Sequence, residues 1–205
     1  INLTATEGEE ITLYAQWRAN NYTIKYEGNN ADGGSMSNQP MAFNVAVNLT
    51  ANAYTRAGYT FTGWNSNADG SGIGYADGQS VINLTSVEGG TVMLYAQWKP
   101  HQYTVKFDGN TADGGGTASQ TMTYDTAADL TANGYTKTGY TFTGWNTQSG
   151  GGGTRYSNGE SVKNLTAEED GNVTLYAQWR ANSYTVKFDG NTADGGSTAS
   201  QTMTY

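Results

Sequence analysis

Hydrophobic and polar residues alternate along several short segments of the chain, and the clearest is Gly139–Asn146, with the sequence GYTFTGWN. Alternation rich in aromatic and β-branched residues is typical of a β-strand, whose successive side chains point to opposite faces. Tyr140 and Phe142 therefore share one face, whereas Trp145 has the opposite parity. An isolated glycine in a strand often marks a β-bulge. We predict a bulge at Gly144 that returns Trp145 to the face of the other two rings and builds a core there.

Two further segments alternate in the same way on either side of this core strand. Tyr103, Val105 and Phe107 share one face of residues 103–109, and the chain alternates again in residues 173–179, VTLYAQW. A turn-rich stretch follows the first of these segments. Residues 117–124 come next and are predicted to pair with the first segment in a hairpin.

The pattern repeats with a period of 81 residues, because Trp17, Trp98 and Trp179 share one repeat position and Trp64 and Trp145 another. Self-similarity at a fixed period is the signature of repeat architectures. We predict four segments, at residues 1–17, 22–98, 103–179 and 184–205. The first is the end of a preceding repeat, with a strand in which Ile11, Leu13, Ala15 and Trp17 share one face. Two full repeats follow, and the last segment is the opening hairpin of a further repeat.

One stretch of the repeat has no clear periodicity. Residues 125–130 fit one or two helical turns, with Asp125 as the N-cap. The equivalent residues Val45 and Val47 are β-branched, which disfavours a helix. The sequence leaves this choice open, and little helix is expected in the chain.

Links of four residues join the predicted repeats, at residues 18–21, 99–102 and 180–183. Links this short hold neighbouring domains close and limit their relative motion, and Pro100 stiffens one of them further. A domain of about 80 residues is only marginally stable alone. Packing between neighbouring repeats is therefore expected to contribute stability.

The composition excludes several classes of protein. The net charge is −8, with 14% charged residues and no cysteine among 205 residues. Binding to nucleic acid needs clustered cations, which this chain lacks. No apolar stretch approaches the length of a membrane-spanning helix. Without cysteine there are no disulfides or thiolate metal sites, and the abundance of Thr, Asn, Gly and Ser is ordinary for a secreted β protein.

The sole histidine, His101, lies in a link where the other copies have Asn20 and Asn182. A catalytic triad built into the repeat would need a histidine in every copy. We therefore interpret His101 as a solvated link side chain, and no residue of the chain is predicted to be catalytic.

The acidic turn of the first hairpin offers a second candidate for chemistry. Asp108, Asn110 and Asp113 are spaced loosely like a calcium-binding loop. An EF-hand loop also needs a bidentate Glu at its twelfth position, where this chain has Ser119. Asn, Asp and Gly are ordinary turn formers. We interpret the segment as a turn and expect neither a metal nor another cofactor.

Three tyrosines, Tyr14, Tyr95 and Tyr176, occupy one repeat position off the core face of the closing strand. Exposed tyrosines stack on sugars or anchor partner proteins, and they also cover sheet faces or contacts between domains. These three are the candidate residues for contact with a partner.

The assembled motifs resemble the Listeria–Bacteroides repeat, the family of the internalin B-repeats. They are YTVKFDGN at residues 103–110, GYTFTGWN at 139–146 and LYAQW at 175–179. The resemblance covers residues 22–98 and 103–179 in full and the two terminal fragments in part. It implies a mainly β chain of tandem small β-grasp-like domains, used in bacterial surface and secreted proteins, without catalytic residues.

Periodicity and resemblance together favour a structural repeat of a bacterial extracellular stalk, adhesin or filament over an enzyme. The expected partners are adjacent repeats or copies of the chain head to tail, because each terminal fragment lacks the strands that would bury its apolar face. The alternative is a module that binds a glycan or a host protein through exposed Tyr and Trp.

Overall fold

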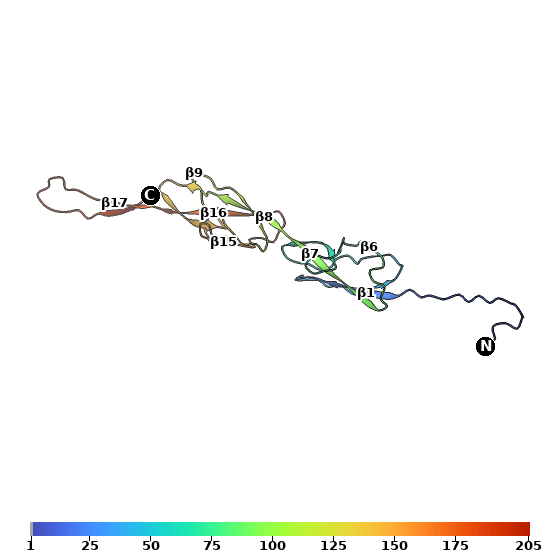
Figure 1. Ribbon diagram of the computed structural model, residues 1–205. Coiled ribbons are helices and arrows are strands. Elements are labelled where there is room, and N and C mark those ends of the chain that lie inside the picture. The colour runs from blue at the N-terminus through green and yellow to red at the C-terminus, as the bar shows by residue number, and fades with distance from the viewer. Residues whose placement is uncertain (1) are drawn as a thin grey trace. The chain divides into compact units, whose positions relative to one another are not determined.

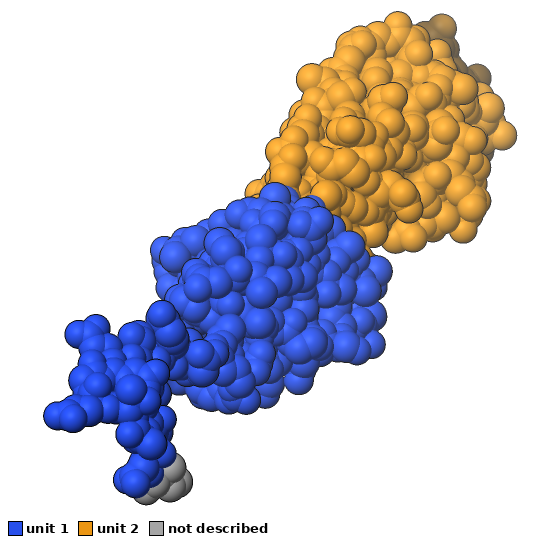
Figure 2. All heavy atoms as spheres, turned by 90° about the vertical axis from the view of Figure 1, so that its right-hand side faces the viewer, with its two compact units in different colours: residues 1–56, 61–98 blue, residues 57–60, 99–205 orange. Residues whose placement is uncertain are grey.

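The computed structural model describes residues 2–205, which form strands and loops without a helix in that range (Figure 1). The mainly β fold predicted from the sequence is therefore confirmed. The chain divides into two compact units, one built from residues up to 56 with 61–98 and the other from residues 57–60 with 99–205 (Figure 2).

The strands follow the alternating segments of the sequence. Up to residue 100 they are β1 (Asn21–Glu27), β2 (Gln39–Ala42), β3 (Val47–Asn48), β4 (Tyr59–Asn65), β5 (Gly74–Tyr75), β6 (Ser80–Val81) and β7 (Gly90–Pro100). Beyond it they are β8 (Gln102–Asp108), β9 (Gly114–Gly115), β10 (Gln120–Thr123), β11 (Ala128–Asp129), β12 (Tyr135–Thr136), β13 (Tyr140–Asn146), β14 (Arg155–Tyr156), β15 (Ser161–Val162), β16 (Gly171–Ala181), β17 (Ser183–Val186) and β18 (Gln201–Thr204).

Two five-stranded sheets carry the fold, in the orders β2-β1-β7-β4-β5 and β10-β8-β16-β13-β14. The first and last long strands of each sheet lie side by side and run parallel, with Tyr22 opposite Gly90 and Tyr103 opposite Gly171. The hairpin predicted at the start of the repeat is confirmed by the antiparallel pairing of β8 with β10. Two parallel neighbours need a long connection. Here the connection contains the other strands of the sheet, β2, β4 and β5 in the first repeat.

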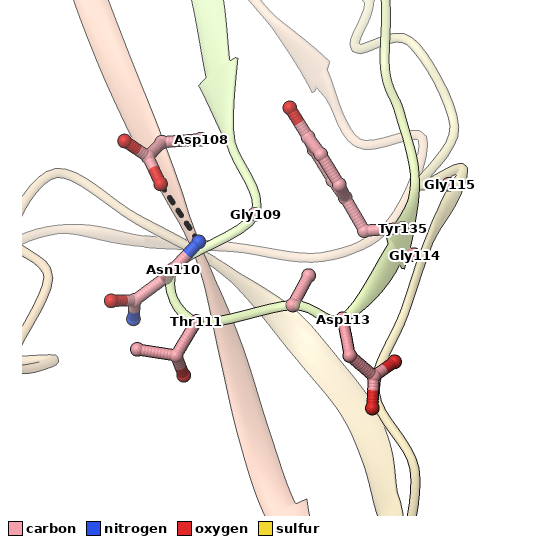
Figure 3. A pocket seen from close by; sticks show the side chains of 9 residues that line it. Asp108, Gly109, Asn110, Thr111, Asp113, Gly114, Gly115 and Tyr135 are labelled. Atoms are coloured by element: carbon pink, nitrogen blue, oxygen red, sulfur yellow. Dashed lines mark hydrogen bonds between the residues drawn. The ribbon is translucent and has the colours of Figure 1, made fainter.

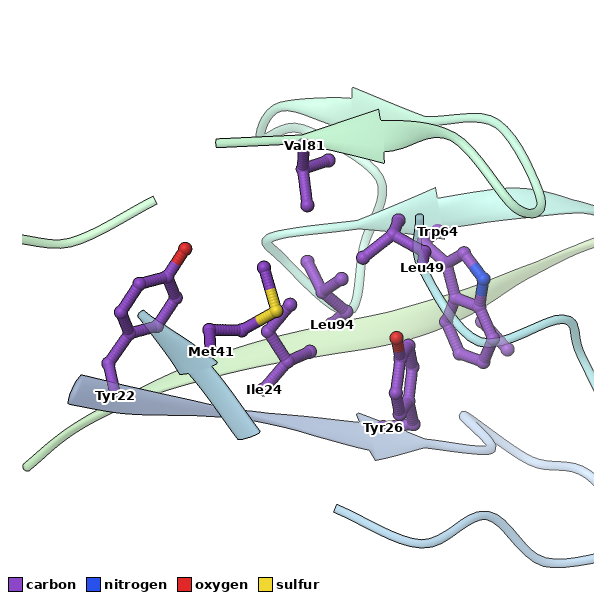
Figure 4. Packing of buried hydrophobic residues seen from close by; sticks show 9 residues of the cluster. Tyr22, Ile24, Tyr26, Met41, Leu49, Trp64, Val81 and Leu94 are labelled. Carbon is purple, nitrogen blue, oxygen red and sulfur yellow. The ribbon is translucent and has the colours of Figure 1, made fainter. Parts of the chain in front are cut away.

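The core of each repeat lies on one face of its sheet. In Figure 4 the side chains of Tyr22, Ile24 and Tyr26 rise from the same face of β1 toward Leu94 and Trp64. The second repeat has an equivalent cluster of buried residues, which comprises Tyr103, Val105, Phe107, Met122, Leu130, Trp145, Val162, Leu175 and Ala177.

The bulge predicted in the core strand is confirmed. The register of β13 against β16 shifts between Phe142 and Gly144, and Gly144 has a φ of 136°. The Trp145 ring is fully buried and lies 5.0 Å from the Phe142 ring, centroid to centroid. Tyr140 does not join them, because it lies at the start of β13 opposite Ala181, beyond the core.

The helical alternative for residues 125–130 is wrong. Asp125 has a φ of 60°, and its N–H donates to Asn164 Oδ1 at 2.6 Å. Asn164 Nδ2 donates back to Asp125 Oδ1 at 2.8 Å. This exchange fixes a turn that leads directly into β11, which pairs with β15, so Asp125 does not cap a helix.

The strand predicted within residues 1–17 is wrong for the described part, residues 2–17, which form no strand. Trp17 is 92% exposed. Within residues 2–205 no strand lies beside this segment to accept its backbone hydrogen bonds. The hairpin predicted at the other fragment does form, because β17 and β18 supply each other's partners, with Ser183 opposite Thr204.

Candidate functional site

The acidic turn of the second repeat borders a shallow hollow that Tyr135 also lines (Figure 3). Asp108 Oδ1 accepts from the Asn110 N–H at 2.7 Å, and Asn110 Nδ2 donates to the carbonyls of Ser149 and Ala177, both at 2.8 Å. These polar groups hold the chain at a positive φ of 45° at Asn110. The predicted turn is therefore confirmed.

Asp113 binds a different backbone segment, at Thr138. Its Oδ2 accepts from the Thr138 N–H at 2.7 Å, and Figure 3 shows its carboxylate on the opposite side of the loop from Asp108. The hydrogen bonds from Thr138 lower the pKa of Asp113. Within residues 2–205 no cluster of three His, Cys, Asp or Glu side chains is arranged to hold a metal ion.

Sequence reasoning missed a buried asparagine that organises the glycine-rich loop after the core strand. Asn146 is fully buried. Its Nδ2 donates to the carbonyls of Gly151 and Gly153, both at 3.2 Å, and its Oδ1 accepts from the N–H groups of Gln148 and Gly153 at 2.9 and 3.0 Å. A buried amide costs little when all its hydrogen bonds are made. The signal was present, since Asn65 follows Trp64 in the other copy and is also buried.

The three candidate tyrosines lie in different surroundings and are not brought together. Tyr14 is exposed in the segment without strands, whereas Tyr95 and Tyr176 are half-buried on the face of β7 and β16 that points away from the core. Tyr95 borders a shallow hollow formed by residues 66–69. Contact of these tyrosines with a partner stays a prediction.

His101 is held on both sides, so the solvated interpretation is wrong. Its side chain is 16% exposed. Its Nδ1 lies 2.6 Å from the Ala167 carbonyl oxygen, which can only accept, so Nδ1 carries a proton. Its Nε2 lies 3.0 Å from Thr60 Oγ1. The sequence could not show this, because the two partners are far away along the chain.

The backbone of His101 also makes two hydrogen bonds to segments that are distant along the chain. Its N–H donates to the Gly58 carbonyl at 2.8 Å, and its carbonyl accepts from the Tyr124 N–H at 2.8 Å. The second compact unit therefore includes the turn at residues 57–60, coloured with it in Figure 2. We call this turn, with His101, Tyr124 and Asp125, the junction.

An aromatic ring covers the glycine of the junction. The Tyr124 ring packs on Gly58 and meets the Tyr59 ring edge to face, with centroids 5.9 Å apart. Tyr59 Oη donates to Asp125 Oδ2 at 2.9 Å. Gly58 has a φ of 73°, and a Cβ added to it would overlap the Tyr124 ring. Glycine is needed here for both its backbone conformation and its lack of a side chain.

The same geometry recurs within the second unit at residues 139–141. Asn182 takes the place of His101: its N–H donates to the Gly139 carbonyl at 2.8 Å, and its carbonyl accepts from the Tyr205 N–H at 3.0 Å. Thr141 Oγ1 donates to Asn182 Oδ1 at 2.6 Å. The Tyr205 ring covers Gly139. Two junctions with different link residues thus share one set of backbone bonds.

Fold and junctions together define a tandem β-repeat protein whose repeats are joined by bound, rather than free, links. The sequence profile of the Listeria-Bacteroides repeat domain matches residues 22–97 and 103–178. The chain therefore belongs to the Listeria–Bacteroides repeat family, as the resemblance of its motifs predicted.

Two relatives from Evansella cellulosilytica share most of this chain. One, named as a Gly-rich membrane protein, is 36% identical over 202 residues, which are 93% of this chain and 20% of the relative. The other, named as a membrane protein, is 31% identical over 197 residues, 92% of this chain and 25% of the relative. The chain thus spans only a fifth to a quarter of these proteins. Among its own residues 2–205, no helix has the length and apolar character to cross a membrane.

Proposed function

We propose that the chain is a load-bearing structural repeat in the extracellular part of a bacterial surface protein, such as a stalk, adhesin or filament. One observation carries this proposal: the strand that opens each repeat and the strand that closes it lie side by side and run parallel. β1 pairs with β7 from Tyr22 opposite Gly90 to Glu27 opposite Tyr95, and β8 pairs with β16 in the same way.

The parallel pair decides how tension acts on a repeat. The chain enters the sheet at the first residue of β1 and leaves it beyond the last residue of β7. Tension along the chain pulls these two ends in opposite directions, so the strands must slide past each other. The hydrogen bonds of the pair are then loaded together, whereas a hairpin pulled at its open end loses its bonds one after another.

The core opposes the same sliding motion. Tyr26 on β1 packs against Trp64, with ring centroids 4.7 Å apart, and Leu94 on β7 is fully buried between them and the remaining core. Sliding of β1 along β7 would expose these side chains. At about 25 cal/mol per Å² of apolar surface, this adds a penalty that hydrogen bonds alone would not give.

Relatives and family support placement at the bacterial envelope. Both relatives are named as membrane proteins and are several times longer than this chain, which fits a set of repeats that forms one part of a larger protein. The junctions fit the same role, because each link residue is bonded both to the preceding turn and to the following hairpin. Repeats of this kind set reach and spacing, each contacting mainly its neighbours.

Pulling single molecules tests the proposal, and the absence of cysteine in the chain makes added cysteines unique handles. Ala19→Cys with Lys99→Cys loads β1 and β7 at opposite ends. Ala19→Cys with Val87→Cys is the matched control, because it loads the same two strands at the same end and peels them apart.

The first geometry is expected to rupture at clearly higher force. Unfolding should release roughly 280 Å of chain, since an extended residue spans about 3.3–3.6 Å. Equal rupture forces in the two geometries would overturn the load-bearing role, because the parallel pair would then give no mechanical advantage.

A second candidate function is the binding of a glycan or a protein by the tyrosines of the closing strand. The hollow that Tyr95 borders with residues 66–69 favours it. A glycan array decides this: binding that is lost in Tyr95→Ala and Tyr176→Ala supports a binding module, and binding unaffected by both variants rules these tyrosines out.

A further inference from the structure

Asn20 and Phe43 of the first repeat correspond to His101 and Tyr124 of the junction, but no glycine turn lies on them among residues 2–205. Its link is held as the next link is. Glu88 accepts from the Asn21 N–H at 2.7 Å and pairs with Arg18 at 2.8 Å. In the second repeat Glu169 accepts from the Gln102 N–H at 3.1 Å and lies 4.0 Å from Lys99.

Asn20 has the partners of His101 on the side of the following repeat. Its carbonyl accepts from the Phe43 N–H at 2.8 Å, as that of His101 accepts from Tyr124. Its Nδ2 donates to the Ser86 carbonyl at 2.9 Å, as His101 Nδ1 does to Ala167. Among residues 2–205 the Asn20 N–H and Oδ1 make no hydrogen bond. The equivalent groups of Asn182 bind Gly139 and Thr141.

The side chains around Asn20 are more apolar than their counterparts. Phe43 occupies the same repeat position as Tyr124 and Tyr205, whose rings cover Gly58 and Gly139. Exposed Val45, Ile82 and Val87 stand where the second repeat has polar residues, Thr126, Lys163 and Glu168. The hydrogen bonds between Asn44 and Asn83 place the segments of Val45 and Ile82 side by side. Exposed apolar side chains that gather in this way indicate a surface that becomes covered.

We propose that Asn20, Phe43, Val45 and Ile82 form the docking surface for the glycine-aromatic-threonine turn of a further repeat that precedes this one in the longer protein. The inference rests on the proposed function. In the docked state the Phe43 ring covers the glycine, the Asn20 N–H donates to the glycine carbonyl, and Asn20 Oδ1 accepts from the threonine hydroxyl.

Two observations identify the occupant. A second copy of this chain offers no open turn, because Tyr124 covers Gly58 and Tyr205 covers Gly139. In the junction at His101, the docked turn belongs to the same repeat as the closing motif LYAQW that leads into the link. The same motif, at residues 13–17, leads into the link at Asn20. The turn on Phe43 therefore comes from the repeat that ends with residues 13–17.

An extended chain tests the docking surface. A copy of residues 21–81 placed directly before Ile1 completes a repeat ahead of the link, because Ile1 to Trp17 correspond to Ile82 to Trp98. NMR then reads two signals. Protons of a glycine that lies on an aromatic ring are shifted upfield by the ring current, and a bonded Asn20 N–H exchanges slowly with solvent.

In the 205-residue chain the protons of the two junction glycines, Gly58 and Gly139, should be shifted upfield, and the Asn20 N–H should exchange rapidly. In the extended chain the junction glycine of the added turn should also be shifted upfield, as the third junction glycine, and exchange at Asn20 should slow. Phe43→Ala should remove the third upfield shift, and Phe43→Tyr should keep it. Ile73→Ala is the matched control, because Ile73 is exposed and lies outside the docking surface.

An added repeat that folds while its glycine keeps an ordinary shift and Asn20 exchanges rapidly would overturn the inference. The pulling experiment would stand unaffected by that result, since it loads strands inside one repeat. Slowed exchange at Asn20 in the 205-residue chain that depends on its concentration would instead show a second copy as occupant, and would also overturn the assignment.

Discussion

Residues 13–17 and 94–98 have the same sequence, LYAQW, yet only the second forms a strand. Leu94 is fully buried in β7, whereas Leu13 is 75% exposed. β7 lies between β1 and β4, which supply its hydrogen bonds and its core contacts. The comparison shows that alternation specifies which side chains a strand can bury, while neighbouring strands decide whether the strand forms.

At the other end of the chain, the strands of an incomplete repeat do form. Residues 103–124 and 184–205 differ only at Gly116 and Ser197, and both form the first hairpin with the same register. Phe107 is 8% exposed, but Phe188 is 51% exposed. The pairing of the hairpin is therefore encoded locally, whereas burial of its apolar face requires the closing strand.

The largest effect is expected from the ring at the centre of a complete repeat. Trp145→Ala should destabilise the second repeat by about 3–5 kcal/mol, the usual cost of truncating a buried aromatic side chain. Urea unfolding of the full chain, followed by the remaining tryptophans, measures the change. A loss below about 1 kcal/mol would place the ring outside the packed core.

The identical LYAQW segments provide a matched pair. Leu175→Ala should cost about 2–5 kcal/mol, because it leaves a cavity in the core, while Leu13→Ala should stay within about 0.5 kcal/mol, as is usual at the surface. The same unfolding measurement applies to both. Similar losses at the two positions would mean that residues 13–17 are packed in solution.

The sequence predicted the parts of the fold that depend on local pattern. Alternation located the hairpin and the core strand, and the parity of Trp145 against Phe142 predicted the bulge at Gly144. The helical alternative at Asp125 failed because the deciding partner, Asn164, lies in another segment. A short polar stretch is compatible with either a cap or a turn, so the pattern alone could not decide.

The candidate site was less accessible to sequence reasoning. His101 was interpreted as solvated because it lies in a link where the other copies have asparagine, but its ring is bound by Ala167 and Thr60. Tyr140 was placed in the core by its parity, yet its ring meets Tyr205 at 5.9 Å. In both cases the contact depends on how the link holds the preceding turn, which periodicity does not reveal.

Alanine substitutions at glycines with positive φ distinguish the cost of backbone strain from the cost of disturbing the packing at a junction. Gly8, Gly89 and Gly139 all have positive φ, where a side chain costs roughly 1–2 kcal/mol. Gly89→Ala should show this cost alone, because a Cβ there meets nothing within 4 Å. Gly139→Ala should lose more, since its Cβ would displace the Tyr205 ring.

Gly8→Ala is the control from the terminal segment and should leave stability unchanged, because no packed structure depends on its turn. Urea unfolding and the chemical shifts of Tyr205 report these effects separately. Equal losses for Gly89→Ala and Gly139→Ala, with Tyr205 unperturbed, would show that the ring does not rest on Gly139 in solution.

The smallest effect concerns Asp113, which binds the Thr138 N–H in the complete repeat, whereas its copy Asp194 is exposed in the terminal hairpin. The hydrogen bonds from Thr138 lower the pKa of Asp113 in the folded chain. The ionised carboxylate therefore stabilises the fold at pH values above the ordinary pKa of about 3.9, and this contribution is lost as pH falls through the lowered pKa.

Asp113→Asn should reduce the urea midpoint at pH 7, and the difference from the unmodified chain should shrink toward pH 3. Asp194→Asn should change neither value. A difference at Asp113 that is the same at both pH values would mean that the side chain acts as a neutral acceptor, without a contribution from its charge.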